Sequence, residues 1–247
     1  MSASLRVCVL ATRSSGKVRE LLPLLKAHGW SPLTLDEAGV VYDEAEEQIE
    51  VHDSFEANAL AKARHYAARV PYPVFADDSG LAVDALHGAP GVYSKRWCGR
   101  DDLNGDALDA ANNAHLLKAL EAAGAMRADQ RGARYVCIAA YAVGAQTMGA
   151  QTMGAQVLAG QMPGVQAPEA WARGETRGHI LSAPVGEGGF GYDPYFHSAD
   201  LQASFAVVPT EAKATVSHRG RAFRSLLETL ERGTFLPSPV DPGSRLG

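Results

Sequence analysis

The amino-acid sequence predicts an α/β fold, and three observations lead to that prediction. The chain has 247 residues, enough for one large α/β domain, or two lobes around one cleft, with a sizeable core. A short apolar run over residues 5–11 is followed by a polar turn and then by apolar residues at helical spacing. Residues 135–141 are almost all apolar, as in a sheet strand covered on both faces. Strand, helix and buried strand together favour a sheet with helices packed against it.

The N-terminal part is expected to form a strand, a turn and a helix. Residues 5–11 are the strand and residues 12–17 the polar turn, after which apolar residues recur at helical spacing as far as Gly29. Pro23 lies within this helix, lacks a backbone donor and is predicted to kink it.

The middle of the chain is predicted to contain a helix and then two extended pieces. An Asp-Ser-Phe-Glu cap at 53–56 begins a helix that continues to about Val70. A strand over 74–76 is then expected to enter a sharp glycine-containing turn at 77–80, and 81–83 to leave it as a second extended piece. Carboxylates at such a turn would face a cleft or solvent.

Two more helices are predicted, over about 106–123 and from Ser217 to a stop at Gly233. Between them, Gln-Thr-Met-Gly-Ala occurs twice in tandem at 146–155, which is far too short a period for a solenoid. We interpret it as an expanded low-complexity hairpin near 144–168 without a catalytic role. The proline-rich residues 235–247 are expected to form a loose tail.

Composition narrows the class of protein. A hydrophobic fraction of 46%, a charged fraction of 21% and a net charge of -5 are those of an ordinary globular protein, and no basic stripe indicates a nucleic-acid partner. Cys8, Cys98 and Cys137 fit neither a zinc spacing nor a disulfide framework, which favours a reducing cytoplasm. No stretch has the length of a membrane helix, so no membrane association is expected.

The first polar cluster is the turn between the N-terminal strand and helix. Backbone N–H groups at the helix start, two kinds of hydroxyl and a lysine are all donors suited to phosphate. The glycine and following hydroxyl of a Walker motif are missing, and an ordinary capped turn with a surface lysine is the alternative. The candidate substrate-binding residues here are Thr12, Arg13, Ser14, Ser15, Gly16 and Lys17.

The second cluster is Asp77-Asp78-Ser79-Gly80. Adjacent carboxylates repel each other unless a cation or hydrogen bonds compensate, and a divalent metal is the natural compensator. Mg²⁺ typically takes one or two protein carboxylates and completes its shell with water and phosphate oxygens. A solvated turn is the alternative.

The third and fourth clusters lie in the C-terminal third. Three glycines surround Phe190 and Tyr192 in Gly188–Pro194, which suits close approach of backbone amides and an aromatic face to a flat ligand; the alternative is packing of these aromatics in the core. Lys213 and Ser217-His218-Arg219 place cations at a helix N-terminus, which suits anion binding; a purely structural histidine is the equal alternative.

Taken together, these segments resemble the inosine triphosphate pyrophosphatase family over roughly residues 5–232. The order and spacing of the motifs carry the resemblance more than any single motif. The matching segments are Ala11-Thr12 with Gly16–Leu21, Asn58-Ala59 with Lys62–Arg64, Ala76–Leu81, Gly88–Ser94, Gly189–Pro194 and Ser217–Gly220.

The resemblance implies a mixed central sheet with flanking helices and two lobes around a nucleotide-binding cleft, within a single pyrophosphatase domain over residues 1–234. It implies a homodimer that requires Mg²⁺. The resemblance implies an enzyme that hydrolyses small non-standard purine nucleoside triphosphates, namely ITP, dITP and XTP, to monophosphate and pyrophosphate. Such an enzyme would remove deaminated purines from the nucleotide pool.

Roles for individual residues also come from the resemblance. Asp78 is similar to the family's essential carboxylate, described as base or metal ligand, and Glu50 to its acidic metal partner. Asp77 and Lys62 join Asp78 as candidate catalytic residues, with Ser79 and Gly191 as neighbouring substrate contacts. Lys17, Lys62, Lys213 and Arg219 would hold the triphosphate; Phe190 would stack on the base, and Tyr192, Asp193 and His218 would help read its edge.

The chemistry of these residue types suits such a reaction, because phosphoryl transfer depends mainly on charge neutralisation and in-line positioning of water. Asp77 or Asp78 would orient or deprotonate the water that attacks the α-phosphorus, and the motif does not divide the work between them. Two alternatives stay open: a pyrophosphatase for pyrimidine triphosphates, as in the structurally similar Maf group, and a catalytically silent nucleotide sensor.

One position departs from the family pattern. The phosphate turn of the family usually reads Thr-x-Asn before Gly-Lys, whereas this chain has Ser14 at the Asn position. A serine hydroxyl can donate to phosphate but is shorter than an amide. The sequence therefore predicts retained activity with a changed KM.

Overall fold

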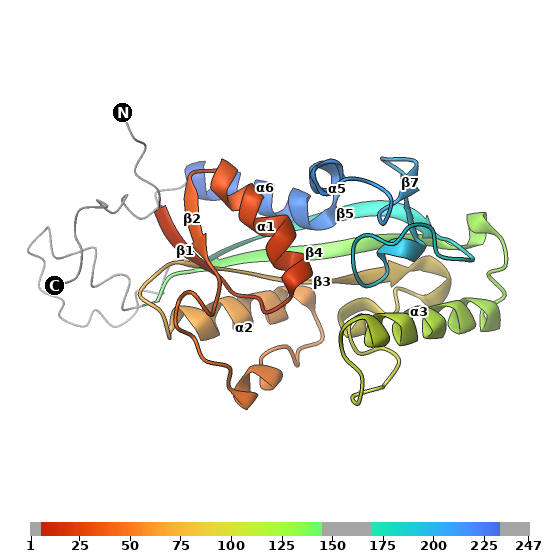
Figure 1. Cartoon of the computed structure of the whole chain (residues 1–247), viewed down its shortest axis with the longest axis horizontal. Helices are drawn as coiled ribbons and strands as arrows, with labels where there is room; N and C mark the ends of the chain where they lie inside the picture. The colour runs from red at the N-terminus through yellow and green to blue at the C-terminus, as the bar shows by residue number, and fades with distance from the viewer. Residues whose placement is uncertain (1–5, 145–168, 233–247) are drawn as a thin grey trace, which may run out of the picture. The chain divides into compact units, whose positions relative to one another are not determined.

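The computed structural model describes residues 6–144 and 169–232 (Figure 1). Its strands form one seven-stranded sheet in the order β2-β1-β3-β4-β5-β6-β7. Strand β1 pairs in parallel with β2 and β3, whereas β6 pairs antiparallel with β5 and β7, so the predicted mixed sheet is confirmed. The strands are β1 Arg6–Leu10, β2 Trp30–Leu33, β3 Val74–Val83, β4 Gly132–Ala142, β5 Glu169–Ile180, β6 Phe196–Ser198 and β7 Ala203–Ser204.

The four predicted helices, α1, α2, α3 and α6, begin close to their predicted starts, and serine side chains cap two of them. Ser14 and Ser54 accept hydrogen bonds from Lys17 N and Ala57 N, which satisfies donors that a helix leaves free in its first turn. None of the helices in the described ranges is long and apolar enough to cross a membrane. The longer helices are α1 Ser15–Ala27, α2 Phe55–Ala67, α3 Gly105–Ala122, α5 Thr210–Val216 and α6 His218–Arg232.

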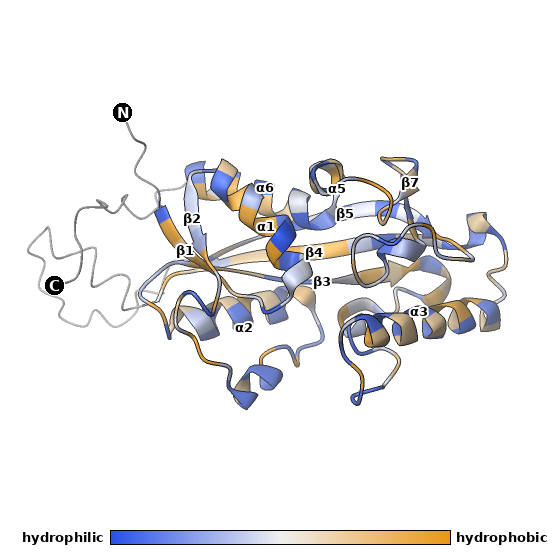
Figure 2. Ribbon diagram, in the orientation of Figure 1, coloured by the Kyte–Doolittle hydropathy of each residue, from blue (hydrophilic) through white to orange (hydrophobic). Residues whose placement is uncertain are grey.

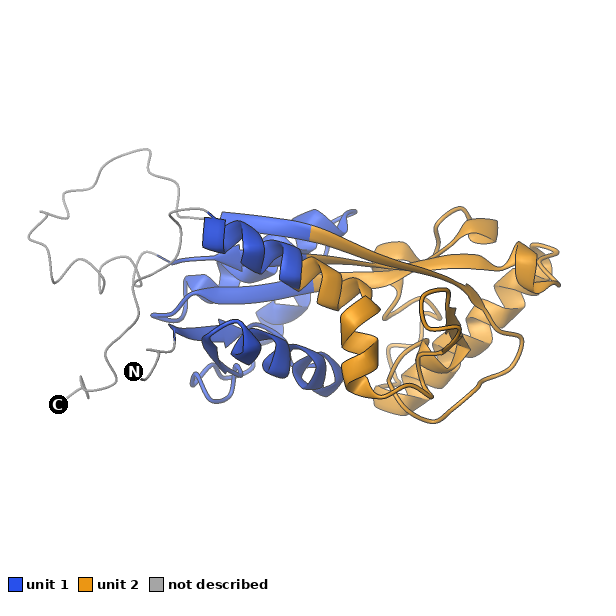
Figure 3. Cartoon of the chain, turned by 90° about the horizontal axis from the view of Figure 1, so that it is seen from above, with its two compact units in different colours: residues 1–77, 139–172, 224–247 blue, residues 78–138, 173–223 orange. Residues whose placement is uncertain are grey.

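The chain divides into two compact units, each built from separate segments (Figure 3). Unit 1 contains residues 1–77, 139–172 and 224–247, and unit 2 contains residues 78–138 and 173–223. The unit boundary falls inside β3, β4, β5 and α6. No linker in the described residues therefore separates the units.

The core of unit 1 centres on three aromatic side chains. Phe75 of β3 lies with its ring centroid 5.0 Å from Trp30 of β2 and 5.2 Å from Tyr141 of β4. All three are almost fully buried, as are residues 8–10 of β1. Figure 2 shows β4 as largely apolar, which agrees with the prediction of a strand covered on both faces.

The core of unit 2 collects apolar residues from β3, β4, β5, α3 and the β6–β7 region. Tyr135 of β4 stacks on the ring of His218, with 4.6 Å between centroids, and also contacts Phe196 and Phe205. Helix α6 lies very close to Gly174 of β5. A Cβ atom built at Gly174 would lie only 2.2 Å from the His218 carbonyl oxygen. The residues of this core include Leu81, Val83, Leu116, Leu120, Tyr135, Ile180, Tyr192, Phe196 and Phe205.

The predicted turn at 77–80 is wrong: β3 runs without interruption through Asp77-Asp78-Ser79-Gly80. The composition resembles that of a turn, but the polar groups find partners within an extended strand. Lys17 pairs with the Asp77 carboxylate, and the Asp78 carboxylate accepts from its neighbour's backbone N–H. Tertiary contacts thus override local propensity here.

Five further elements were not predicted, four strands and one α-helix. Strands β2, β6 and β7 and helix α5 have two to seven residues each and carry little periodicity. Strand β5 has twelve residues, but its charged residues and glycines interrupt the apolar pattern by which a strand is recognised. The predicted hairpin near 144–168 and the tail over 235–247 lie almost entirely outside the described residues.

Candidate functional site

In unit 1, the turn between β1 and α1 is held by its own hydroxyl groups. Thr12 is buried, and its Oγ1 accepts from Ser14 N at 3.2 Å. Ser14 Oγ accepts from Lys17 N at 3.4 Å and so acts as the N-cap of α1. Gly16 is buried while Ser15 is exposed. The turn thus offers an ordered helix N-terminus, with the positive end of its dipole.

Arg13 makes several contacts within unit 1. Its Nη1 lies 2.9 Å from Asp36 Oδ1, its Nη2 donates to the Val40 carbonyl oxygen at 3.1 Å, and it holds Glu46 through both Nε and Nη2. The guanidinium therefore binds the acidic segment before α2 and ties it to the phosphate-type turn. These contacts give Arg13 a structural role, and its contact with substrate stays a prediction.

Asp77 is the centre of a cationic cluster in unit 1. Its side chain is fully buried, and Lys17 Nζ lies 3.0 Å from its Oδ2. Lys62 of α2 donates to the Asp77 backbone oxygen at 3.0 Å and also pairs with Glu50. The structure therefore brings four predicted site residues together around the end of the unit 1 part of β3.

Glu50 is kept ionised by these lysines. Burial alone raises the pKa of its carboxyl, but the charges of Lys62 and Lys17 outweigh burial and lower the pKa below its ordinary value. The loop carrying Glu50 is fixed by Asn58, whose Oδ1 accepts from His52 N at 2.9 Å and whose Nδ2 donates to the His52 carbonyl oxygen at 3.3 Å. No role for Asn58 is predicted from the sequence.

Asp78 begins the site residues of unit 2 and follows Asp77 directly in β3. It is 8% exposed, in contrast to the complete burial of Asp77, and its Oδ1 accepts from Ser79 N at 2.8 Å. Ser79 Oγ in turn accepts from Arg219 Nη2 at 2.9 Å. One strand therefore presents the carboxylate and anchors the arginine.

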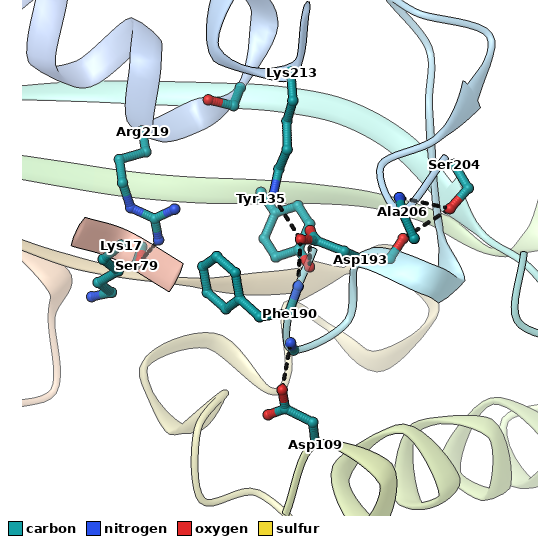
Figure 4. Close-up of polar contacts among 12 residues, drawn as sticks. Lys17, Ser79, Asp109, Tyr135, Phe190, Asp193, Ser204, Ala206, Lys213 and Arg219 are labelled. Atoms are coloured by element: carbon teal, nitrogen blue, oxygen red, sulfur yellow. Dashed lines mark hydrogen bonds and ion pairs between the residues drawn. The ribbon is translucent and has the colours of Figure 1, made fainter. Parts of the chain in front are cut away.

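Asp193 is buried at the centre of the site residues of unit 2 (Figure 4). Its Oδ2 accepts from Lys213 Nζ at 2.6 Å and from Phe190 N at 2.9 Å, and its Oδ1 accepts from the Tyr135 hydroxyl at 3.4 Å. Asp193 and Lys213 are 2% and 4% exposed, so this ion pair is almost desolvated. Such a buried pair fixes geometry more than it adds stability.

Phe190 lies beside two cations. Lys213 Nζ is 5.1 Å and the Arg219 guanidinium carbon 5.6 Å from its ring centroid, both within range of a cation–π contact. Ser217 Oγ accepts from Gly220 N and so caps α6, which places His218 and Arg219 in its first turn. The structure therefore brings Phe190, Lys213 and Arg219 together.

Two predicted recognition residues are committed to internal contacts. The Tyr192 hydroxyl donates to the Ser94 carbonyl oxygen at 2.8 Å, and burial raises the pKa of the phenol. His218 is 3% exposed, with its ring stacked on Tyr135. The Tyr192 side chain thus packs in the core, the role that the sequence left open as the alternative for this loop.

Two residues of α3 complete the unit 2 group and were missed from the sequence. Asp109 Oδ2 accepts from Gly191 N at 2.6 Å, and Asn113 Nδ2 donates to the Gly191 carbonyl oxygen at 2.9 Å. They lie about eighty residues before the loop they hold, so no local pattern connects them to it. Polar side chains on the buried side of a predicted helix were the one available signal.

Carboxylate oxygens are the donors available to a metal. No group of three or more His, Cys, Asp or Glu suited to a metal occurs within residues 6–144 and 169–232. Glu50, held ionised, and the slightly exposed Asp78 are oxygen donors of the kind that fits Mg²⁺, which needs few protein ligands. The donor set fits that ion better than it fits zinc.

Comparison with known sequences extends these observations. Residues 8–229 match the model of the Ham1 family. The chain is 40% identical over 221 residues to the dITP/XTP pyrophosphatase of Nitratidesulfovibrio vulgaris, covering 89% of this chain and 93% of that protein. It is 39% identical over 225 residues to the dITP/XTP pyrophosphatase of Escherichia coli K12, covering 91% and 98% of the two chains.

Solved structures give the same result. A HAM1 protein from Coxiella burnetii superposes with a TM-score of 0.70 at 31% identity, covering 93% of this chain and 100% of that chain. A nucleoside-triphosphatase, or dITP/XTP pyrophosphatase, from Mycobacterium abscessus has a TM-score of 0.61 at 35% identity, covering 91% and 99%. Fold, motifs and these similarities lead to one conclusion: the chain belongs to the Ham1 family.

Proposed function

We propose that this protein hydrolyses non-standard purine nucleoside triphosphates, namely ITP, dITP and XTP, to the monophosphate and pyrophosphate with Mg²⁺ as cofactor. The observation that carries the proposal is the pairing of Asp77 with Lys17 and Lys62 directly beside Asp78 in β3. The names of the relatives, all dITP/XTP pyrophosphatases, support the same substrate class.

The triphosphate binds to the unit 1 cluster. Backbone N–H groups at the start of α1 accommodate phosphate oxygens, and the ammonium groups of Lys17 and Lys62 neutralise their charge. Asp77 and Glu50 hold these two lysines in position before substrate arrives. Preorganised charge of this kind acts without reorganisation during the reaction.

Asp78 is the residue that we assign to the attacking water. Asp77 is fully buried and paired with Lys17, whereas Asp78 retains some exposure. Asp78 orients the water and accepts its proton as the water oxygen bonds to the α-phosphorus and the bond to the bridging oxygen of pyrophosphate breaks. Asp77 is then a positioning residue for the lysines.

Mg²⁺ would be held by Glu50 and Asp78, together with water and phosphate oxygens. When bound, the ion supplies positive charge to the phosphate oxygens and helps the pyrophosphate to leave. A carboxylate bound to metal is a weaker base than a free one, so Asp78 accepts the proton of the water only as the new bond to the α-phosphorus forms.

The base stacks on Phe190 in unit 2. Lys213 and Arg219 beside the ring, and the backbone amides of the glycine-rich loop, supply hydrogen-bond donors. A purine with oxygen at position 6 can accept from such donors, whereas the 6-amino group of adenine leaves them unpaired. The pocket therefore favours inosine and xanthosine over adenosine.

The deciding experiment measures pyrophosphate released from ITP, dITP, XTP, ATP, dTTP and UTP with and without Mg²⁺. We expect kcat/KM for ITP and XTP to exceed that for ATP by roughly 10²-fold or more, with activity lost in EDTA and restored by Mg²⁺. A preference for dTTP or UTP would instead indicate a pyrimidine pyrophosphatase.

Replacement of the assigned catalytic carboxylate provides the second test. Asp78→Asn should lower kcat roughly 10²- to 10³-fold while leaving the unfolding temperature close to that of the native protein. A protein without activity on any triphosphate, but stabilised thermally by ITP with Mg²⁺, would be a nucleotide sensor, since ligand binding raises stability by linkage.

Two further features belong to the same proposal. Cys8, Cys98 and Cys137 are all free thiols, which suits a reducing cytoplasm. We also infer a homodimer, which light scattering at micromolar concentration would test.

A further inference from the structure

The loop that carries Phe190 has a backbone with little intrinsic stiffness. Gly186, Gly189 and Gly191 adopt φ values of 89°, 77° and 63°, a region that favours glycine. Residues 182–189 are exposed. A loop of this composition does not hold an aromatic ring in one place by itself, so its position depends on contacts with the rest of unit 2.

Packing does not supply all of these contacts. Between α3 and this loop lies a hollow of about 400 Å³, lined by Asp106, Asp109 and Asn113 on the helix side and by residues 186–191 on the other. The α3 side of the loop is therefore partly unsupported by side-chain packing. Whatever fixes the loop on that side must be specific hydrogen bonds.

Two side chains of α3 make these bonds, and both reach the same residue. Asp109 Oδ2 accepts from Gly191 N at 2.6 Å, while Asn113 Nδ2 donates to the Gly191 oxygen at 2.9 Å and to the Asp109 backbone oxygen at 2.8 Å. Asn113 is only 6% exposed. Asp109 thus fixes the N–H group of Gly191 and Asn113 fixes its carbonyl group. Asn113 is also bonded to the backbone of Asp109, so the two anchoring residues are linked to each other.

The other side of the loop is fixed by the buried ion pair. Phe190 N donates to Asp193 Oδ2, which also accepts from Lys213. The backbone of Phe190 and Gly191 is therefore held from both sides, by Asp193 and by the pair on α3. Figure 4 shows the contacts of Asp193 and Asp109. The Phe190 side chain leaves the backbone between these two anchors.

We propose that Asp109 and Asn113 are positioning residues for base recognition: by fixing Gly191, they hold the Phe190 ring where the purine stacks. This inference rests on the proposed function, because it takes Phe190 as the base platform. Both side chains act through the backbone of Gly191, to which they are hydrogen-bonded.

The environment of Asp109 agrees with a role as acceptor. Burial raises the pKa of its carboxyl above the ordinary value, and the charges of Asp106 and Asp193 act in the same direction. The Gly191 N–H opposes them by stabilising the carboxylate. An amide oxygen accepts the same hydrogen bond without the charge, so Asp109→Asn is the conservative replacement and Asp109→Ala the disruptive one.

The test compares Asn113→Ala, Asp109→Ala and Asp109→Asn with the native protein. Asp106→Ala is the matched control, because Asp106 is an exposed carboxylate on the same helix and lines the same hollow. Three quantities are measured: KM and kcat for ITP, the inhibition constant of inorganic tripolyphosphate, which has no base, and amide hydrogen exchange of peptides covering residues 186–192.

We expect both alanine variants to raise KM for ITP about 10- to 100-fold through misplacement of the ring, while kcat and the tripolyphosphate constant change less than about threefold. Exchange in 186–192 should be faster in these variants. Asp109→Asn should restore most of the affinity, and Asp106→Ala should match the native protein in all three measurements.

Unchanged KM and unchanged exchange in the alanine variants would overturn the proposal. So would a parallel rise of KM and of the tripolyphosphate constant, which would indicate a general structural role. If Asn113→Ala fails to fold, the two Asp109 variants decide. Absence of pyrophosphate release from the native protein would overturn the proposed function instead, and would leave the exchange result as a separate test of the loop anchor.

Discussion

Arg13 holds Glu46 through two hydrogen bonds, from Nε to Oε2 at 2.9 Å and from Nη2 to Oε1 at 2.8 Å. The guanidinium also stacks over Tyr42, with 5.6 Å to the ring centroid. This pair joins the turn before α1 to the acidic segment before α2, two segments that both lead to residues of the unit 1 cluster. Bidentate pairing fixes orientation as well as distance.

The first prediction concerns the pH dependence of this pair. The hydrogen bond from Arg13 lowers the pKa of Glu46 from 4.5 to about 2, against the opposing effect of burial. Since the folded-state pKa is depressed, the stabilisation is complete above the unfolded value and lost as the pH falls toward 2. The difference in unfolding free energy between native protein and Glu46→Gln should therefore be constant above pH 5 and shrink steadily below pH 4.5.

Chemical denaturation at a series of pH values measures this difference. Glu44→Gln is the control, because Glu44 is exposed and lies with Glu46 in the short 3₁₀ helix Glu44–Gln48. At neutral pH we expect Arg13→Ala to lower stability by about 1 kcal/mol, given the partial exposure of the pair. If Arg13→Ala instead raised KM for ITP tenfold without loss of stability, Arg13 would be a substrate-binding residue and not a structural one.

The fold could be predicted where one segment carried a long, regular pattern. The helices near 15–27 and 218–232 and the buried strand near 132–142 were recognised from periodicity and caps. The 77–80 segment was misread because the partner that favours an extended strand, Lys17, is sixty residues away. The residues around 77–80 therefore do not indicate that this partner exists.

For the candidate site, too, some features could be predicted from the sequence and others could not. The residue types of the two clusters were predicted because phosphate, metal and base recognition each need particular side chains. What could not be predicted was which polar groups hold others in place: Arg13 with Glu46, Tyr192 with Ser94 and Asn113 with Gly191. These pairs join residues far apart in sequence, so only the tertiary structure shows them.

A second prediction concerns Ser14, where the chain departs from the family pattern. Ser14 caps α1, and asparagine caps helices as well as serine does. Ser14→Asn should therefore leave stability unchanged, whereas Ser14→Ala should cost about 1 kcal/mol. We expect the longer amide to lower KM for ITP severalfold through contact with phosphate; an unchanged KM would show that Ser14 is no handicap.

A third prediction separates the two adjacent aspartates. Asp77→Asn leaves the largely buried Lys17 without its carboxylate, which should destabilise the protein by about 3 kcal/mol and raise KM. Asp78→Asn should instead lower kcat roughly 10²- to 10³-fold at nearly native stability. Steady-state kinetics and thermal unfolding of both variants give the four quantities needed, and the reverse pattern would exchange the roles assigned to the two residues.

The last prediction concerns the close approach of α6 to β5 at Gly174. A Cβ atom there would lie 2.2 Å from the His218 oxygen and 2.4 Å from Ala222 N, both backbone atoms that cannot move aside as a side chain does. Gly174→Ala should therefore cost at least about 2 kcal/mol of stability. Arg177→Ala, at an exposed position of the same strand, is the control and should change stability by less than about 0.5 kcal/mol. Because α6 carries His218 and Arg219 in its first turn, displacement of the helix should also raise KM for ITP, so a Gly174→Ala variant with native stability and native KM would show that the helix can shift without disturbing the site.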